Sequence, residues 1–240
     1  MMKYFFQKYS QMSRSQQGLA GAGEWETLRK LLPDFKDKRV LDLGCGYGWH
    51  CIYAMEHGAS SVVGVDISHK MLEVAKEKTH FPQVEYKCCA IEDVEFPEES
   101  FDVILSSLAF HYVADYEILV KKIYRILKSG GNLVFTVEHP VFTAYGTQDW
   151  YYNEKGEILH FPVDNYYYEG KRTAVFLGEK VTKYHRTLTT YLNTLLSNGF
   201  IINHIVEPQP PEYMMDIPGM QDEMRRPMML IVSANKKVDR

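Results

Sequence analysis

Three glycines at alternate positions, Gly44, Gly46 and Gly48, constrain the fold of this chain more than any other feature of its sequence. They follow a largely apolar run, residues 40–43, which reads as a buried strand, and they precede a helical segment that starts at Trp49. Because glycine weakens the interior of a helix or strand, the cluster predicts unusual backbone dihedrals or a close approach to another group. A strand, a glycine turn and a helix N-terminus together can receive the polar end of a ligand.

Strand-like and helix-like segments alternate along most of the chain. We expect helices at residues 24–32, 49–57, 69–78, 116–127 and 186–197, and strands at 39–44, 60–66, 84–89, 101–107, 131–138, 200–206 and 227–235. This alternation is typical of an α/β protein whose doubly wound, mostly parallel sheet has helices on both faces. Ligands of such sheets bind at the carboxyl ends of the strands, near the point where the strand order reverses.

The chain reads as one domain, residues 1–240, with two additions to the sheet. Residues 1–38 are expected to form an N-terminal helical cap. Residues 139–184 interrupt the alternation after the fifth strand and carry 11 aromatic side chains in 46 residues, against 13% in the whole chain. We interpret this segment as an insertion over the top of the sheet. Its aromatic side chains would line a ligand pocket or, alternatively, form a satellite core or a dimer surface.

Composition argues against several classes of protein. A net charge of −4 and a pI of about 6.1 argue against a nucleic-acid partner. The four cysteines fit neither a zinc signature nor the disulfide framework of a secreted protein. Because no apolar run is long enough to span a bilayer and the first residues do not read as a signal peptide, we expect no membrane partner and a cytoplasmic location. The oligomeric state is left open between monomer and homodimer.

The glycine spacing separates classes of ligand. The dinucleotide fingerprint G-x-G-x-x-G places its third glycine one residue beyond Gly48, where this chain has Trp49. A phosphate-binding P-loop needs a G-K-[ST] sequence, and none follows the turn. The turn therefore fits a ligand whose anionic group is smaller than a pyrophosphate.

Three sequence blocks resemble the class I S-adenosylmethionine-dependent methyltransferases, and within them the bacterial small-molecule group that includes ubiquinone/menaquinone-type enzymes. The blocks are VLDLGCGYG at residues 40–48, VVGVDIS at 62–68 and FPEESFDVILSSLAFHYV at 96–113. The resemblance covers residues 39–137 well and the remainder more loosely. It implies a Rossmann-like methyltransferase fold with a seven-stranded sheet, and S-adenosylmethionine as cofactor.

The resemblance also implies which residues bind that cofactor. N–H groups of the glycine turn can receive its carboxylate, Asp42 can favour its ammonium, and Asp66 can accept hydrogen bonds from both ribose hydroxyls. Ile67 is expected beside the adenine, although Ala90 stands where the family has an adenine-facing aspartate. Asp42 and Asp66 have the alternative role of capping a helix or turn. The predicted cofactor set is Asp42, Gly44, Cys45, Gly46, Gly48, Asp66, Ile67, Ile91, Glu92 and Ser106.

Methyl transfer is an in-line displacement, to which a protein contributes much by alignment and by excluding water. A base is needed only when the nucleophile arrives protonated. His111, after the fourth strand, and His139, at the end of the fifth, are the candidate catalytic bases, because imidazole titrates near working pH. The alternative is that both only order their loops; His185 either faces the pocket or begins a helix. Since Ser106 stands where metal-dependent catechol-type enzymes keep an acid, no metal is expected.

The sequence therefore predicts an enzyme, a methyltransferase (EC 2.1.1.-) that acts on a small, partly apolar acceptor. Residues 139–184 would form the acceptor site or its lid, and the cap, with Tyr9, Arg14 and Trp25, would close over the cofactor. One alternative is a protein that binds S-adenosylmethionine or S-adenosylhomocysteine without transferring a methyl group. Another is a nicotinamide oxidoreductase, which the glycine spacing disfavours.

Overall fold

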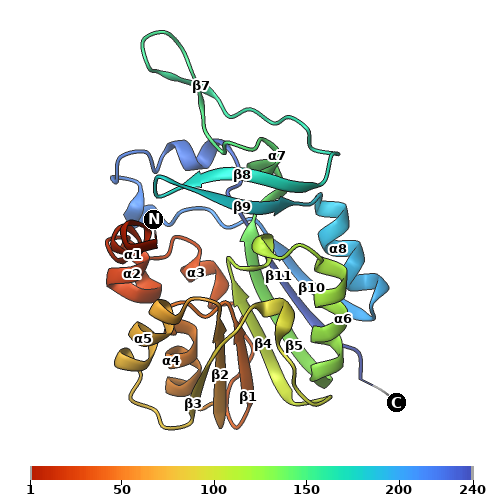
Figure 1. The fold of residues 1–240 in the computed structure, drawn as a ribbon. Coiled ribbons are helices and arrows are strands. Elements are labelled where there is room, and N and C mark those ends of the chain that lie inside the picture. The colour runs from red at the N-terminus through yellow and green to blue at the C-terminus, as the bar shows by residue number, and fades with distance from the viewer. Residues whose placement is uncertain (1, 239–240) are drawn as a thin grey trace.

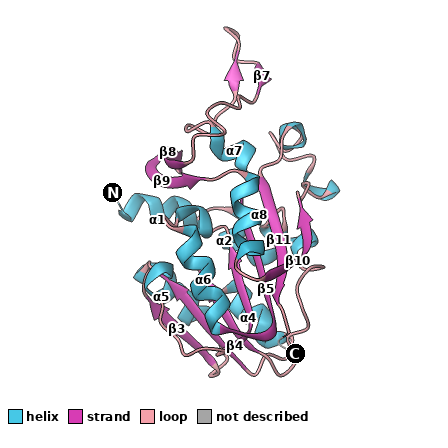
Figure 2. Ribbon diagram, turned by 90° about the vertical axis from the view of Figure 1, so that its right-hand side faces the viewer, coloured by secondary structure: helices cyan, strands magenta, loops and turns pink. Residues whose placement is uncertain are grey.

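The computed structural model of the chain describes residues 2–238, which form a layered α/β structure around one central sheet (Figures 1 and 2). The seven strands of this sheet are β1 (Arg39–Leu43), β2 (Ser61–Asp66), β3 (Val84–Cys88), β4 (Phe101–Ser107), β5 (Leu127–Glu138), β10 (Phe200–Val206) and β11 (Met229–Lys236). Their order is β10-β11-β5-β4-β1-β2-β3, and only β11 is antiparallel to its neighbours. The predicted doubly wound, mostly parallel seven-stranded sheet is confirmed.

Two buried clusters, one on each face, explain why the central strands are apolar. Leu41 and Leu43 belong to the cluster that includes residues of helices α6 (Tyr116–Ile126) and α8 (Leu188–Ser197). Val40 belongs to the other cluster, with residues of α3 (Trp25–Leu28), α4 (Trp49–Glu56) and α5 (His69–Lys78). Since successive side chains of a strand point to opposite faces, both sets must be apolar when both faces are covered. The strand order reverses between β1 and β4, directly beneath the glycine turn.

Two of the expected helices differ in their bounds by more than one residue at an end. The helix expected at 24–32 is limited to α3, and the chain continues through turns to Pro33. The helix expected at 186–197 begins at Leu188. Its N-cap is Thr187, whose side chain accepts the N–H of Thr190 at 3.1 Å. An N-cap residue has extended rather than helical backbone, so residue 186 lies before the helix.

The insertion after β5 contains α7 (Pro140–Ala144) and two hairpins, β6–β7 (Tyr151–Tyr152 and Ile158–His160) and β8–β9 (Gly170–Phe176 and Glu179–His185). The β8–β9 hairpin lies across the carboxyl ends of the central strands in Figure 1, whereas β6–β7 projects away from the body in both views. The insertion therefore covers the edge of the sheet at which α/β proteins bind ligands.

The N-terminal cap consists of α1 (Met2–Ser10), α2 (Ser13–Gln17), the 3-10 helix η1 (Gly18–Gly21) and α3. It packs closely on α4, because a Cβ atom at Gly18 would lie 3.1 Å from the ring of Trp49. Gly18 also has φ +65°, so both its conformation and its surroundings favour glycine. Among residues 2–238, no helix combines the length and apolar character needed to span a bilayer.

Two alanine substitutions test how tightly the glycine turn is packed. Gly44 and Gly156 have nearly equal φ, +81° and +79°, but a Cβ at Gly44 would lie 2.4 Å from the Cβ of Ala109, whereas Gly156 has no atom within 4 Å. We expect Gly156→Ala to lower the free energy of unfolding by about 1–2 kcal/mol, and Gly44→Ala by about 2–5 kcal/mol, since it adds overpacking to the same backbone cost. Urea denaturation measures both; equal losses would contradict the packing argument.

Candidate functional site

The glycine turn is fixed by hydrogen bonds to the end of β2. Its three glycines have φ of +81°, +53° and +75° at Gly44, Gly46 and Gly48. The N–H groups of Gly44 and Cys45 both donate to the carbonyl oxygen of Val65, at 2.8 and 2.9 Å, and Gly48 N–H donates to the oxygen of Cys45 at 2.8 Å. Gly48 is the N-cap of α4, so the turn leads directly into the helix.

These bonds correct one expectation from the sequence. The N–H groups of Gly44, Cys45 and Gly48 are engaged within the protein, and that of Gly46 donates to the Asp66 carboxylate at 2.9 Å. Buried backbone donors are paired in folded proteins, and here the turn pairs its own. These four N–H groups are therefore not free to receive a carboxylate.

Asp66 ends β2 and supports the turn with both carboxylate oxygens. Oδ2 accepts the N–H of Gly46 at 2.9 Å, and Oδ1 accepts the N–H of Ser68 at 2.8 Å. Burial raises the pKa of this carboxyl, while the two N–H bonds act in the opposite direction. Since each carboxylate oxygen offers two lone pairs, the group can still accept two hydroxyl donors. Both the capping role and the predicted ribose role are thus compatible with its geometry.

Asp42 lies beneath the turn and is almost completely buried. Its Oδ2 accepts a hydrogen bond from the Cys51 thiol at 3.5 Å, whereas its Oδ1 has no partner among the described residues. Burial raises the pKa of Asp42 to about 7. A buried acceptor without a donor is costly, so this oxygen favours a nearby positive charge.

The residues expected beside an adenine follow β2 and β3. Ile67 is 73% exposed, next to Asp66. Ile91 and Glu92 belong to the 3-10 helix η2 (Ile91–Asp93), and the Cδ1 atom of Ile91 lies 3.5 Å from the place where a Cβ at Gly44 would be. The Glu92 side chain is exposed, and its carbonyl oxygen accepts a bond from Lys122 Nζ at 2.6 Å. Ile67 thus lies beside the end of β2, and Ile91 lies beside the turn after β1.

Ser106 is placed differently from its neighbour Ser107. Its hydroxyl donates to the carbonyl oxygen of Leu43 at 2.7 Å and is buried between β4 and β1. Ser107 instead lines the cavity beside the glycine turn. The sequence pointed to this strand end, but it could not show which of the two adjacent serines faces the cavity.

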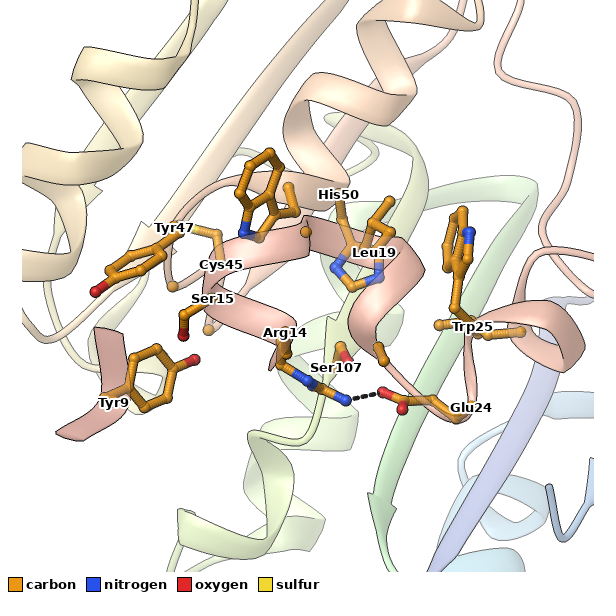
Figure 3. Close-up of a pocket in the computed structure, with 16 residues that line it drawn as sticks. Tyr9, Arg14, Ser15, Leu19, Glu24, Trp25, Cys45, Tyr47, His50 and Ser107 are labelled. Atoms are coloured by element: carbon orange, nitrogen blue, oxygen red, sulfur yellow. Dashed lines mark hydrogen bonds and ion pairs between the residues drawn. The ribbon is translucent and has the colours of Figure 1, made fainter. Parts of the chain in front are cut away.

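A cavity of about 530 Å³, including its open mouth, lies between the cap and the glycine turn (Figure 3). From the core it is lined by residues 44–47, Trp49, His50 and Ser107, and from the cap by Tyr9, Arg14, Ser15, Gly18, Leu19, Ala22, Glu24, Trp25 and Leu28. Sequence reasoning suggested Tyr9, Arg14 and Trp25 but missed Glu24, His50 and Ser107. The one available signal for His50 was its place in the first turn of the helix after the glycines.

Four buried polar atoms around this cavity have no hydrogen-bond partner within residues 2–238. They are Ser15 Oγ, Glu24 Oε2, Trp49 Nε1 and His50 Nε2. Proteins rarely leave buried polar atoms unpaired, and such atoms at a cavity are completed by ordered water or by a polar ligand. Together with Asp42 Oδ1 below the turn, they suit an amino-acid tail, and the Asp66 carboxylate suits a sugar diol.

The two candidate catalytic histidines lie outside this cavity's lining. His111 lies in the 3-10 helix η3 (Phe110–Tyr112), its Nδ1 accepts the N–H of Glu138 at 3.3 Å, and burial lowers its pKa to about 4. His139 caps α7: its Nδ1 accepts the N–H of Val141 at 3.1 Å, and its Nε2 lies 2.9 Å from Glu207 Oε1.

His185 is fully buried at the end of β9. Its Nδ1 lies 2.7 Å from Thr143 Oγ1, and its Nε2 lies 2.8 Å from the carbonyl oxygen of Tyr166. It therefore does not begin a helix. Both contacts join segments of the insertion, which gives this side chain a structural role.

A buried polar group joins the insertion to the end of β5. Lys183 Nζ on β9 lies 2.5 Å from Glu138 Oε1 and donates to Gln148 Oε1 at 2.8 Å, while Gln148 Nε2 donates to Glu138 Oε2 at 2.7 Å. Burial would raise the pKa of Glu138, but His111, Lys183 and Gln148 together lower it. An ion pair completed by further hydrogen bonds holds the hairpin in a defined position over the sheet.

The fold and the site define a Rossmann-like methyltransferase, and comparisons with known proteins agree. A family model for the methyltransferase domain matches residues 41–135. A crystal structure from Listeria monocytogenes, described as an S-adenosylmethionine-dependent methyltransferase, is 58% identical with a TM-score of 0.88, over 92% of this chain and 99% of that one. One from Mesorhizobium loti, described likewise, is 40% identical with a TM-score of 0.84, over 91% and 100%.

One curated relative is named for a pathway and for methylation at oxygen. The ubiquinone biosynthesis O-methyltransferase of Coxiella burnetii is 35% identical over 112 residues, which is 46% of this chain and 47% of that enzyme. The chain belongs to the class I S-adenosylmethionine-dependent methyltransferases, and S-adenosylmethionine is its cofactor.

The buried Asp42 predicts a pH dependence of stability. Its pKa is about 7 in the folded chain against 3.8 for an exposed aspartate, so between these values only the folded state holds the proton. The free energy of unfolding therefore falls as pH rises from about 4 to about 7. Asp42→Asn removes this part of the slope, and at pH 8 its free energy of unfolding is expected to exceed that of wild type by on the order of 4 kcal/mol. The exposed Asp93→Asn is the control in urea denaturation across this range; an unchanged slope in Asp42→Asn contradicts the assignment.

Proposed function

We propose that this methyltransferase acts on a small, partly apolar acceptor that binds beneath the insertion, near the carboxyl ends of β4 and β5. The observation that carries the proposal is the closed position of the β8–β9 hairpin, which the buried Glu138–Lys183 pair holds over this edge. A macromolecular acceptor needs an open surface, whereas a covered edge favours a small molecule that can be enclosed. The relationship to an O-methyltransferase of ubiquinone biosynthesis supports the same acceptor class.

The partly apolar character follows from the rings near Lys183. Its Nζ lies 6.0 Å from the ring centre of Tyr112, after β4, and 5.6 Å from that of Phe176, on β8. Tyr112 is 41% exposed, so part of its ring is available to a ligand. Aromatic rings around a cation and a carboxylate provide apolar contact together with a few fixed polar groups.

The cofactor supplies a methyl group on a positively charged sulfur when it is bound. In our proposal Asp66 holds the ribose hydroxyls, Ile67 and Ile91 pack on the adenine, and Asp42 favours the ammonium. The glycine turn positions Asp66 through the hydrogen bond from the Gly46 N–H. Because glycines have no side chain, the backbone of the turn can approach the cofactor closely. The insertion excludes water from the acceptor side of the site, and the cap excludes water from the side of the glycine turn. A cytoplasmic location and a monomer or homodimer belong to the same proposal.

His111 is the better candidate for a base. It stands at the end of β4, it is buried, and its lowered pKa of about 4 keeps the ring neutral at pH 7. Because Nδ1 accepts the Glu138 N–H, the neutral ring carries its proton on Nε2, and action as a base requires that Nδ1 be released. His139 is the weaker candidate because both of its nitrogens already face protein groups.

Asp66→Ala tests the proposed ribose contact. We expect the affinity for S-adenosylhomocysteine to fall about 10- to 100-fold, since a charge-assisted acceptor for two hydroxyls is lost. Ser68→Ala is the matched control, because Ser68 caps α5 in the same turn but carries no carboxylate. Isothermal titration calorimetry measures the affinities. An affinity for Asp66→Ala within twofold of wild type would rule the ribose contact out.

A metabolite screen tests the acceptor class. Incubation of the enzyme with S-adenosylmethionine and pooled small molecules should yield S-adenosylhomocysteine and one product heavier by about 14 Da, the mass of one methylene; turnover with protein or RNA alone would contradict the proposal. With that acceptor, we expect His111→Asn to lower kcat by about 10²- to 10⁴-fold if His111 is the base. His139→Asn is expected to change kcat less than tenfold, and the reverse order would transfer the role to His139.

A further inference from the structure

One segment of the insertion projects away from the body of the protein. We call residues 149–164 the arm; it contains the hairpin β6–β7 and extends beyond the β8–β9 hairpin in both views (Figures 1 and 2). A two-stranded hairpin is only marginally stable by itself in water. Exposed apolar side chains gathered on one segment mark an interaction surface. The arm carries four, which are Tyr151 (57% exposed), Tyr152 (43%), Leu159 (49%) and Val163 (50%).

The root of the arm is held in place by the segment that precedes β11. The guanidinium of Arg226 lies 5.0 Å from the ring centre of Trp150 and 4.8 Å from that of Phe161, and the two rings pack edge to face at 5.2 Å. Arg225 Nη2 donates to the carbonyl oxygen of Leu159 at 2.7 Å. These contacts fix the direction in which the arm points, so a partner that binds it pays little for ordering it.

The arm is acidic, and its carboxylates have no cationic partner within the chain. Against a single lysine, Lys155, it carries four exposed carboxylates, which are Asp149, Glu154, Glu157 and Asp164. Among residues 2–238, none of these four forms an ion pair. The arm thus offers a partner negative charge together with aromatic and aliphatic side chains, and its complement is a surface that is basic and partly apolar.

The β8–β9 hairpin presents a surface of this kind. Ala174 and Lys183 are buried against the body of the protein, so the residues that alternate with them on the two strands face away from the central sheet. This outer face consists of the exposed residues Lys171, Thr173, Val175, Lys180 and Thr182. Neither of its lysines forms an ion pair in the described part of the chain. Two unpaired cations here match the unpaired carboxylates of the arm.

The arm and the outer face of one chain do not meet, because the arm points away from its own β8–β9 hairpin in both views (Figures 1 and 2). We propose that the partner is a second copy of this chain, bound so that the arm of each copy lies on the outer face of the other. Such an exchange is a two-fold contact in which every complementary pair occurs twice. Facing charges of opposite sign give the contact its specificity, and the apolar side chains contribute affinity through burial.

Analytical ultracentrifugation of the wild-type chain is the first test, and it needs neither cofactor nor acceptor. We expect a reversible monomer–dimer equilibrium with a Kd of about 10 µM or tighter, the range of interfaces of ordinary size. Since salt screens exposed charges, the Kd should rise when the ionic strength increases from about 0.05 to about 0.5 M. A chain that stays monomeric up to a concentration of about 200 µM, well above that Kd, would overturn the proposal, because the arm would then meet a different partner or none.

A charge exchange between two variants tests the two surfaces. The face variant carries Lys171→Glu and Lys180→Glu, and the arm variant carries Glu154→Lys and Glu157→Lys. Each variant alone brings like charges together in its own homodimer, so we expect its Kd to be at least about tenfold weaker than that of wild type. In an equimolar mixture, both arms of the heterodimer again meet a face of opposite charge, so the Kd should return to within about threefold of wild type.

The matched control reverses two exposed lysines far from the insertion, Lys76→Glu on α5 and Lys121→Glu on α6, and should leave the Kd unchanged. A wild-type dimer that neither the face variant nor the arm variant weakens forms through another surface, and that result overturns the proposal. A mixture that remains as weakly associated as the separate variants does so too.

If a charge variant does not fold, Tyr151→Ser with Leu159→Ser replaces it, because it alters the arm without changing its charge. We expect this variant to weaken the dimer at least about tenfold at low and at high salt, since burial of apolar side chains is screened by neither. A dimer of unchanged Kd in this variant would overturn the arm as the contact surface.

Discussion

The carbonyl oxygen of Val65 is the point on which the cofactor side of the structure depends. It accepts the N–H groups of both Gly44 and Cys45, so the turn after β1 is fastened to the end of β2. The next residue, Asp66, then binds Gly46 and Ser68 through its carboxylate. Two loops from different strands thereby form one hydrogen-bonded unit. Such preorganisation lowers the ordering cost when a ligand binds.

Glycine is required in this unit for reasons of space as well as conformation. A side chain at Gly44 would meet Ala109, and one at Gly48 would lie 2.2 Å from the Tyr86 hydroxyl. The turn is therefore enclosed by the loop after β4 on one side and by β3 on the other. Since the backbone cannot shift without moving these neighbours, the carboxyl ends of β1, β2 and β4 keep a fixed geometry.

Two additions cover this rigid edge. The cap lies over the glycine turn, and the β8–β9 hairpin lies over β4 and β5. They meet each other where Lys8 Nζ of α1 donates to the oxygen of Leu177 at the hairpin tip, at 3.0 Å. An exposed contact of this kind contributes little stability by itself. A ligand that enters between them would then be enclosed from both sides.

The sequence predicted the sheet, the turn and the family because each depends on local pattern. Alternating segments define the parallel sheet, and positive φ at Gly44, Gly46 and Gly48 explains their spacing. What it could not predict depends on contacts between distant segments. The N–H groups of the turn looked free but bind Val65 and Asp66, and only the three-dimensional position of the cap brings Glu24 beside His50. The choice of Ser107 over Ser106 depends on one residue of strand register, which pattern alone does not fix.

A crystal structure of the protein with S-adenosylhomocysteine tests the central claim most directly, because it locates both ends of the ligand at once. Our account predicts the ribose against the end of β2 and the amino-acid tail between Arg14 and the glycine turn. A nucleoside bound elsewhere, or a tail that points away from the cap into solvent, would contradict it.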